Sequence, residues 1–346
     1  MKEMQMLNGK TILVTGGTGS FGNMFARMTL DKYKVKRLII LSRDEMKQWD
    51  MAKAFTNYPN VRFFIGDVRD VTRLRHAMYD VDYVVHAAAT KIVPTAEYNP
   101  FECIKTNING AMNVVDAALA NKVKKVVALS TDKACNPINL YGATKLASDK
   151  LFIAANAYSG RRNTLFSIVR YGNVMGSRGS VIPFFRTLIE QGNNKLPITD
   201  ARMTRFMITL QQAVELVWLS FKDMHGGEIY VPKIPSMSVT DIGKAISSTA
   251  EQIFIGIRPG EKLHEMMISP EDAPNTYEYR HYYKILPIIL GDSRYQSCIK
   301  NGALVGGDFY YSSDSNSQWM TISELHTWLS ENRQEGDTRT HGHNPA

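Results

Sequence analysis

Short apolar runs alternate with amphipathic stretches along the first half of the chain. Each run has the length and composition of a buried β-strand, and each amphipathic stretch has the apolar period of a helix. The strand-like runs cover 11–15, 37–42, 61–66, 83–88, 125–130 and 164–170, and the helical stretches cover 21–31, 99–120 and 141–158. Strands that alternate with helices predict a parallel sheet with helices on both faces. The expected fold class is α/β, a Rossmann-type doubly wound parallel sheet.

The regular alternation ends near Gly176. Further on, 178–192 and 209–222 read as amphipathic helices, and 227–231 and 252–257 read as short strands. We therefore expect a Rossmann domain over 8–176, to which some later segments return, and a smaller C-terminal lobe over 177–330. The polar stretch 333–346 has the composition of a disordered tail, and His341 and His343 are expected to be tail residues rather than metal ligands.

Composition and charge narrow the class of protein. The 346 residues are 44% apolar and 21% charged, as in globular enzymes. No apolar run approaches a membrane span, the N-terminus lacks the apolar core of a signal peptide, and Cys103, Cys135 and Cys298 form neither a disulfide framework nor a metal spacing. A cytoplasmic protein is expected. The net charge of +8 is dispersed, which argues against nucleic-acid binding and suits anionic small molecules.

A glycine-rich loop follows the first strand. Gly17, Gly19 and Gly22 satisfy G-x-G-x-x-G, and Gly16 extends the match to the related G-x-x-G-x-x-G. Glycines at these positions allow backbone N–H groups to approach a pyrophosphate at the N-terminus of the next helix. Such a match alone can be an ordinary loop, but the strand before it and the helix after it predict a dinucleotide site. Further residues expected to line this cofactor are Ser20, Phe21, Asp44, Glu45, Asp67, Val68, Ala87, Ala88, Leu129, Ser130, Tyr141, Lys145, Tyr171, Asn173 and Val174.

The residues after the second strand select the dinucleotide. NAD-binding proteins usually carry an acidic residue there, but this chain has Ser42 and Arg43, with Lys47 one turn later. A hydroxyl and a guanidinium suit the 2′-phosphate of NADP. Asp44 and Glu45 follow directly, so Arg43 could instead be a solvated surface charge. The pattern predicts NADP.

Two short motifs carry the candidate chemistry. Tyr141 and Lys145 lie four residues apart and so share one face of a helix. The ammonium of Lys145 is expected to favour the phenolate of Tyr141 and make it a base near neutral pH. Thr131, Asp132 and Lys133 end the fifth strand and add a second acid and a second base, although a solvated turn is the alternative. One base suffices to oxidise an alcohol, so the extra pair indicates that a proton and a leaving group are handled too.

Together these motifs resemble those of extended short-chain dehydrogenases/reductases that act on sugar nucleotides. The closer resemblance is to the inverting UDP-N-acetylglucosamine 4,6-dehydratases of pseudaminic acid biosynthesis, the PseB type. It covers roughly residues 8–325 and is carried by the segments 42–45, 64–70, 96–100, 128–150, 170–174, 176–180, 224–228 and 258–265.

The resemblance implies a reaction in four steps. Tyr141 takes the O4 proton of the sugar while a hydride passes from C4 to NADP+, and Thr131 hydrogen-bonds the same oxygen. The new ketone makes H5 acidic, Lys133 removes it, and Asp132 protonates the departing O6. The hydride then returns to C6 and a proton to C5. Retaining relatives carry Asp-Glu at this point, so by analogy Lys133 goes with inversion at C5 and an L-arabino 4-keto product.

The resemblance also implies which residues bind the UDP sugar. They are Lys91, Thr131, Tyr141, Asn173, Arg205, Arg258 and Glu261, the last three in the lobe, while the first domain binds NADP. The lysine and the two arginines could instead form structural ion pairs. Ile92 and Met207 depart from the family, which typically has a histidine and an aromatic residue there, and this puts fine substrate preference in question.

Two other functions stay open at this point. A UDP-sugar epimerase would use the same Tyr141 and Lys145 without water loss, but a C4 epimerase needs no base such as Lys133. A non-catalytic NADP-binding regulator would commonly lose the tyrosine–lysine pair, which is intact here. A homo-oligomer, dimer or higher, is expected by resemblance only.

Overall fold

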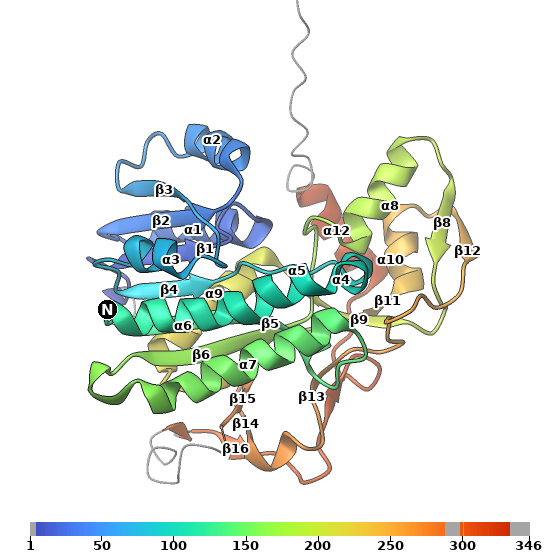
Figure 1. Ribbon diagram of the computed structural model, residues 1–346. Helices are drawn as coiled ribbons and strands as arrows, with labels where there is room; N and C mark the ends of the chain where they lie inside the picture. The colour runs from blue at the N-terminus through green and yellow to red at the C-terminus, as the bar shows by residue number, and fades with distance from the viewer. Residues whose placement is uncertain (1–4, 288–297, 300, 333–346) are drawn as a thin grey trace, which may run out of the picture. The chain divides into compact units, whose positions relative to one another are not determined.

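The computed structural model describes residues 5–287, 298–299 and 301–332, and the chain forms two compact units (Figure 1). Unit 1 comprises Met1–Gly172, Leu210–Lys233 and Met266–Ser312, and unit 2 comprises Asn173–Thr209, Ile234–Glu265 and Ser313–Ala346. The tail predicted over 333–346, with His341 and His343, lies outside the described residues.

Unit 1 is built on a sheet that has ten strands in the described residues, in the order β16-β14-β15-β10-β6-β5-β4-β1-β2-β3. The strands are β1 (Thr11–Thr15), β2 (Arg37–Ser42), β3 (Val61–Ile65), β4 (Tyr83–His86), β5 (Lys125–Thr131), β6 (Leu165–Tyr171), β10 (Ile229–Pro232), β14 (Thr276–Glu278), β15 (Tyr282–Ile285) and β16 (Ala303–Leu304). Pairs from β3 through β10 are parallel, and the β15 side is antiparallel. The order 3-2-1-4-5-6 is that of a dinucleotide-binding fold, so the predicted Rossmann-type α/β class is confirmed.

Helices cover both faces of this sheet (Figure 1). α1 (Ser20–Lys32) packs with α9 (Leu210–Asp223), while α6 (Gly110–Ala120) packs with both α3 (Val71–Ala77) and α7 (Leu140–Tyr158). Because both faces are covered, the inner strands are mostly apolar, and every residue of β1 is buried. The carboxyl ends of these strands carry the residues that the motifs singled out. In unit 1, β13 (Met266–Ile268) also pairs with β17 (Tyr311–Ser312).

Two features of unit 1 differ from the sequence prediction. The helix expected over 99–120 is divided into α5 (Pro100–Ile104), a π-helical turn at Lys105–Asn109, and α6. Three further helices were not predicted: α2 (Glu45–Ala54), α3 and α4 (Val93–Tyr98). The first two share one feature. Each is short and starts at an aspartate whose side chain accepts a hydrogen bond from a first-turn N–H, Asp44 from Lys47 and Asp70 from Arg73, both at 2.9 Å. α2 buries only Gln48 and Met51, so its apolar period is weak.

Unit 2 is smaller and contains two small sheets. β7 (Asn173–Val174), β9 (Thr204–Ile208) and β11 (Ser236–Ser238) form one, and β8 (Lys195–Ile198) pairs in parallel with β12 (Glu251–Phe254) in the other. Its helices are α8 (Val181–Glu190), α10 (Val239–Ile246) and α12 (Ile322–Glu331). Met207 is buried in an apolar cluster with Met175, Ile182 and Leu325, so the residue that replaces the family's usual aromatic serves the core of this unit.

No helix among the described residues combines the length and the apolar character that a bilayer span requires. The same residues contain no cluster of His, Cys, Asp and Glu side chains suited to a metal ion.

Candidate active site

The glycine loop between β1 and α1 is built for close backbone approach. Gly16 has a φ of +64°, and a Cβ there would lie 2.8 Å from the backbone of Ala88. Gly22 packs against the backbone of Gly17 with no room for a side chain. Gly19 is the N-cap of α1, and Asn23 Nδ2 donates to its carbonyl at 3.1 Å. The first turn of α1, which begins with Ser20 and Phe21, is thereby presented as an anion-binding helix terminus.

Charged residues at the end of β2 form two separate pairs. Asp44 caps α2 and pairs with Lys47 Nζ at 2.7 Å, and Glu45 opens the helix. Arg43 is 3.7 Å from Asp67, and its side chain is 60% exposed. Burial of Asp67 opposes its ionisation, but hydrogen bonds from Arg69 hold its pKa below the usual value. The contact between Arg43 and Asp67 is therefore longer than a hydrogen bond, and the Arg43 guanidinium remains accessible.

The buried Gln48 of α2 fixes this strand end. Its Nε2 donates to the carbonyl and hydroxyl of Ser42 at 3.0 and 3.1 Å, and to the Phe64 carbonyl at 2.8 Å. Sequence reasoning missed Gln48, because only the folded chain brings Phe64 beside Ser42.

The segment after β4 is held by a buried pair. Thr15 Oγ1 and His86 Nδ1 are 2.8 Å apart, and the Ala88 N–H donates to the same Thr15 oxygen at 3.3 Å. Burial lowers the pKa of His86 to about 3, so the imidazole is neutral at pH 7. Ala87 and Ala88 thus follow β4 directly against the glycine loop. Nearby, the Val68 carbonyl accepts from Asn113 Nδ2 at 3.0 Å.

The candidate acid and the candidate base lie in hydrogen-bond contact. β5 ends at Thr131, and Asp132–Ala134 form a single 3₁₀ turn. Asp132 is fully buried, and its Oδ1 accepts from Thr131 Oγ1 at 2.9 Å and from Lys133 Nζ at 3.1 Å. The Lys133 side chain is 22% exposed. The charged pair and a neutral Asp132–Lys133 pair differ only by one proton moved across this contact.

A glycine places this turn beside Tyr141. A Cβ on Gly142 would collide with the carbonyl oxygen of Lys133 and lie 3.0 Å from Pro137 Cβ. The Gly142 N–H donates to the N-cap residue Asn139 at 2.7 Å. Sequence reasoning did not single out Gly142, although it stands next to the candidate tyrosine in the motif. Its missing side chain allows the acid–base turn to pack on the first turn of α7.

In the protein by itself, the pKa of Tyr141 does not shift in the direction that its spacing to Lys145 predicted. Burial raises the pKa of Tyr141 to about 12, and Lys133 and a hydrogen bond with Thr131 oppose this effect. Lys145 Nζ instead donates to the Leu129 carbonyl at 2.7 Å, and burial lowers its own pKa. Spacing placed Tyr141 and Lys145 on one helix face, but burial is the largest influence on the pKa of Tyr141, and the ammonium that opposes it is that of Lys133.

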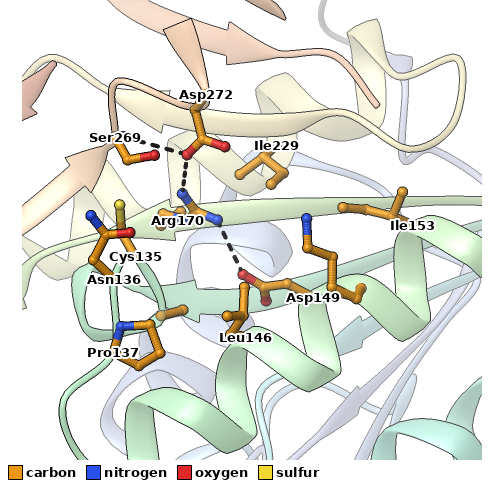
Figure 2. A pocket seen from close by; sticks show the side chains of 12 residues that line it. Cys135, Asn136, Pro137, Leu146, Asp149, Ile153, Arg170, Ile229, Ser269 and Asp272 are labelled. Carbon is orange, nitrogen blue, oxygen red and sulfur yellow. Dashed lines mark hydrogen bonds and ion pairs between the residues drawn. The ribbon is translucent and has the colours of Figure 1, made fainter. Parts of the chain in front are cut away.

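A buried charge network lies behind the turn. Ser130 Oγ donates to Asp149 Oδ2 at 2.7 Å, and Arg170 is 3.5 Å from the same oxygen. Arg170 also donates to the Met267 carbonyl at 2.9 Å and pairs with Asp272 at 3.4 Å. Figure 2 shows the Asp149–Arg170–Asp272 network, whose three residues line a cavity. The volume of this cavity is about 100 Å³. Other lining residues include Ala134, Cys135, Asn136 and Pro137, which directly follow Lys133.

The π-helical turn supplies another residue that sequence reasoning missed. Asn107 is buried, accepts from the Thr90 N–H at 2.8 Å, and donates to the Thr90 carbonyl at 2.9 Å and to Thr144 Oγ1 at 3.0 Å. It therefore ties the segment that carries Lys91 to α7. π-helical turns often mark functional sites, but the apolar period gave no sign of one here. Ile92 is the N-cap of α4 (Val93–Tyr98) and is half exposed.

Unit 2 contains the other predicted substrate contacts. Arg205 is buried and donates to the carbonyls of Thr204, Lys262 and Leu263 at 2.7 to 3.0 Å. Arg258 donates to both carboxylate oxygens of Glu261 at 2.7 and 3.0 Å and is 59% exposed. Arg205 thus has the contacts of a structural arginine that fixes the segment carrying Arg258 and Glu261.

The structure groups the predicted site residues by unit. In unit 1, Thr131, Asp132, Lys133 and Tyr141 lie together, with Lys145 one helical turn along α7. Tyr171 ends β6 and is buried, which raises its pKa. Asn173 and Val174 form β7 and, with Arg205, Arg258 and Glu261, belong to unit 2.

Comparisons with known proteins provide a separate line of evidence on the family of this chain. A family model described as "Polysaccharide biosynthesis protein" matches residues 12–287. The chain is 57% identical over 325 residues to a UDP-N-acetylglucosamine 4,6-dehydratase (inverting) of Campylobacter jejuni, covering 92% of this chain and 97% of that relative. It is 48% identical over 287 residues to a UDP-glucose 4-epimerase of Rickettsia bellii, covering 81% and 84%. The solved structure of Pen from Bacillus thuringiensis matches with a TM-score of 0.86 at 36% identity, covering 94% of this chain and 99% of that chain.

The matched stretch includes the glycine loop, the turn at Asp132–Ala134 and the Tyr141–Lys145 pair. The predicted resemblance is confirmed by these matches. The chain belongs to the polysaccharide biosynthesis protein family, within the extended short-chain dehydrogenases/reductases.

Proposed function

We propose that the protein is an NADP-dependent enzyme that removes water across C5 and C6 of UDP-N-acetylglucosamine and inverts C5. One observation carries this proposal: a buried carboxyl group and a lysine amine, 3.1 Å apart, lie beside the tyrosine that would oxidise the sugar. An epimerase that acts only at C4 has no task for that pair. The similarity to the Campylobacter jejuni dehydratase supports the same reaction.

The residues of unit 1 divide the chemistry among them. Tyr141 takes the proton from O4 while the C4 hydride leaves, and the Thr131 hydroxyl supports the same oxygen. The bound oxidised nicotinamide would accept this hydride and add a positive charge that favours the Tyr141 phenolate. Lys133 then removes H5, which the C4 ketone has made acidic, and Asp132 protonates the departing O6. Lys145 orients the site through α7 and the Leu129 carbonyl.

The resting ion pair supplies both catalytic forms without help from solvent. Lys133 must be a neutral amine to take H5, and Asp132 must be a neutral acid to protonate O6. Moving one proton from Lys133 to Asp132 across 3.1 Å creates both forms at once.

The remaining parts of the proposal rest on resemblance and on residue types. The product is a UDP-2-acetamido-2,6-dideoxy-hexos-4-ulose of L-arabino configuration, a precursor of pseudaminic acid or a related 6-deoxy amino sugar. Arg258 is proposed to contact the diphosphate and Glu261 the ribose, with Lys91 and Asn173 as further substrate contacts. A cytoplasmic homo-oligomer remains a prediction, which size-exclusion chromatography with light scattering checks for its oligomeric part.

Product analysis tests the function. The purified protein is incubated with NADP and UDP-N-acetylglucosamine, and the product is examined by mass spectrometry and NMR. We expect the mass of one water to be lost and the C5 configuration to be inverted. A product of unchanged mass with a new C4 configuration would instead establish the epimerase, which the similarity to the Rickettsia bellii protein keeps as the second candidate.

Arg43→Ala is expected to weaken NADP binding. A hydrogen bond to a charged group contributes about 1.5–3 kcal/mol, so the KM for NADP should rise by roughly 10- to 150-fold while that for NAD changes little. Lys47→Ala is the control, since Lys47 is already paired with Asp44, and should have a smaller effect. Steady-state kinetics with both cofactors provide the measurement. A wild type that prefers NAD would refute the NADP assignment.

Gly142→Ala is expected to impair dehydration without loosening the cofactor. The added methyl group forces the Lys133 carbonyl away, and a misplacement of about 1 Å can cost about 10²-fold in rate. The measurements are kcat for water loss and the Kd for NADP. Gly307→Ala is the control, because a Cβ there meets no atom within 4 Å. Equal kcat values for the two variants would show that the turn tolerates displacement.

A further inference from the structure

After each turnover of the proposed reaction, Tyr141 holds one proton more than at the start and Asp132 holds one fewer. Tyr141 begins as a phenolate and ends with the O4 proton, whereas Asp132 begins as an acid and ends as a carboxylate, because its proton has left with O6 as water. The hydride taken from C4 ends on C6, so no electron pair is left over. Lys133 gives up the proton it took from C5 when C5 is reprotonated or by exchange with solvent. The next turnover therefore needs Tyr141 to lose one proton and Asp132 to gain one, and a direct transfer from Tyr141 to Asp132 would meet both needs.

We propose that Thr131 carries this proton, as a relay that restores the base and the acid together. This inference rests on the proposed function. The Tyr141 O–H bond breaks and its proton goes to Thr131 Oγ, while the proton of the Thr131 hydroxyl goes to Asp132 Oδ1. One O–H bond forms for each that breaks, and no oxidant or reductant takes part.

The hydrogen bond from Thr131 to Asp132 has the direction that such a transfer needs. A threonine hydroxyl donates one hydrogen bond and can accept two. The Thr131 donor is directed to Asp132 Oδ1 at 2.9 Å, which leaves its lone pairs to accept. One accepts from the Lys133 N–H at 3.4 Å, and the hydroxyl is also hydrogen-bonded with the Tyr141 phenol. Tyr141, Thr131 and Asp132 thus form a continuous chain from the group that gains a proton to the group that loses one.

The relay would be useful because both of the groups that it connects are buried. Asp132 is fully buried and Tyr141 is 9% exposed, so exchange of either proton with bulk solvent is hindered. Burial by itself favours a proton on the phenol, and the charge of Lys133 opposes this. A positive charge is next to the phenol again once the hydride has gone to C6, and this charge favours transfer away from Tyr141.

Rapid-quench kinetics of Thr131→Val and Thr131→Ser test the relay. The enzyme, loaded with NADP, is mixed with UDP-N-acetylglucosamine, and dehydrated product per active site is counted by mass spectrometry. Valine keeps the shape but removes the hydroxyl. We expect Thr131→Val to form at most one product per site in a fast phase and then to slow by about 10²-fold. The slow phase should accelerate with the concentration of a small buffer acid at fixed pH. Thr131→Ser should turn over without this buffer dependence.

A control and a second variant keep the result interpretable. Thr144→Val removes another buried hydroxyl near Tyr141 that lies outside the chain to Asp132, and should show no buffer-dependent phase. Thr131→Ala replaces the valine variant if the latter loses its thermal transition or its NADP binding. Equal slowing of the first and later turnovers, without buffer dependence, would overturn the relay and leave Thr131 as a contact to the sugar. Wild-type turnover in Thr131→Val would overturn it too. A wild type that forms no dehydrated product would refute the proposed function, and the relay with it.

Discussion

Lys133→Ala is expected to stop water loss while NADP remains bound. Lys133 would be the group that removes H5, and a positioned general base contributes about 10²- to 10⁴-fold in rate. Tyr141 and Lys145 stay in place, so oxidation at C4 can still occur. The variant should therefore accumulate reduced cofactor on the enzyme, which its near-ultraviolet absorbance reports. The rate of dehydrated product, measured by mass spectrometry, should fall by about 10³-fold.

Two further variants separate the base from its charge. Lys133→Arg keeps a cation beside Asp132, but a guanidinium does not deprotonate in proteins, so it should fail to remove H5 just as alanine does. Lys150→Ala is the matched control, since Lys150 is an exposed lysine on α7. Water loss at the wild-type rate in Lys133→Ala would assign H5 removal to another residue. Recovery of that rate in Lys133→Arg alone would show that only the positive charge is needed.

Local patterns were enough to predict the parts of the site that depend on neighbouring residues. The strand–loop–helix at Gly16 to Gly22, and the four-residue spacing of Tyr141 and Lys145, are properties of a continuous segment. They could be recognised because backbone approach and helix periodicity follow from residue type and spacing. The parallel sheet with helices on both faces could also be predicted, since the alternation of strands with helices leaves few topologies.

Features that depend on distant contacts could not be predicted in this way. The pKa of Tyr141 is set mainly by burial, which belongs to the folded chain rather than to the motif. Arg205 was expected to contact a phosphate, but its donors are directed to carbonyls 57 and 58 residues away. Gly142 shows its role only when the Lys133 carbonyl lies against it. In each case the residue type was compatible with several contacts, and the packing of the folded chain determines which of them the residue makes.

Arg170→Met is expected to have the largest effect on stability. Arg170 is 3% exposed and lies 3.5 Å from Asp149, which is also buried. Removing one partner of a buried ion pair leaves an uncompensated charge and costs about 3–5 kcal/mol. Urea unfolding should show this loss in the free energy of unfolding. Arg75→Met is the control, because Arg75 pairs with Asp116 at 2.7 Å with both side chains about half exposed, and should cost about 0–1 kcal/mol.

The dependence on pH distinguishes a buried charge from lost packing. Burial already raises the pKa of Asp149, although Arg170 and Lys145 oppose this, so loss of Arg170 should raise it further. The folded variant then holds a proton that the unfolded chain releases above about pH 4. Its stability therefore falls relative to wild type as the pH rises from that value, and the deficit should be smaller at acid pH.

A second substitution tests the same cause directly. Arg170→Met combined with Asp149→Asn removes the stranded charge, so the double variant should recover much of the stability that Arg170→Met loses. Ser130 keeps an acceptor in the asparagine oxygen, so the end of β5 beside Thr131 stays anchored. A deficit that is unchanged in the double variant and independent of pH would mean that Arg170 stabilises unit 1 by packing and by its bond to the Met267 carbonyl. Recovery would instead show that the Asp149 charge, one turn of α7 beyond Lys145, is what Arg170 is needed to neutralise.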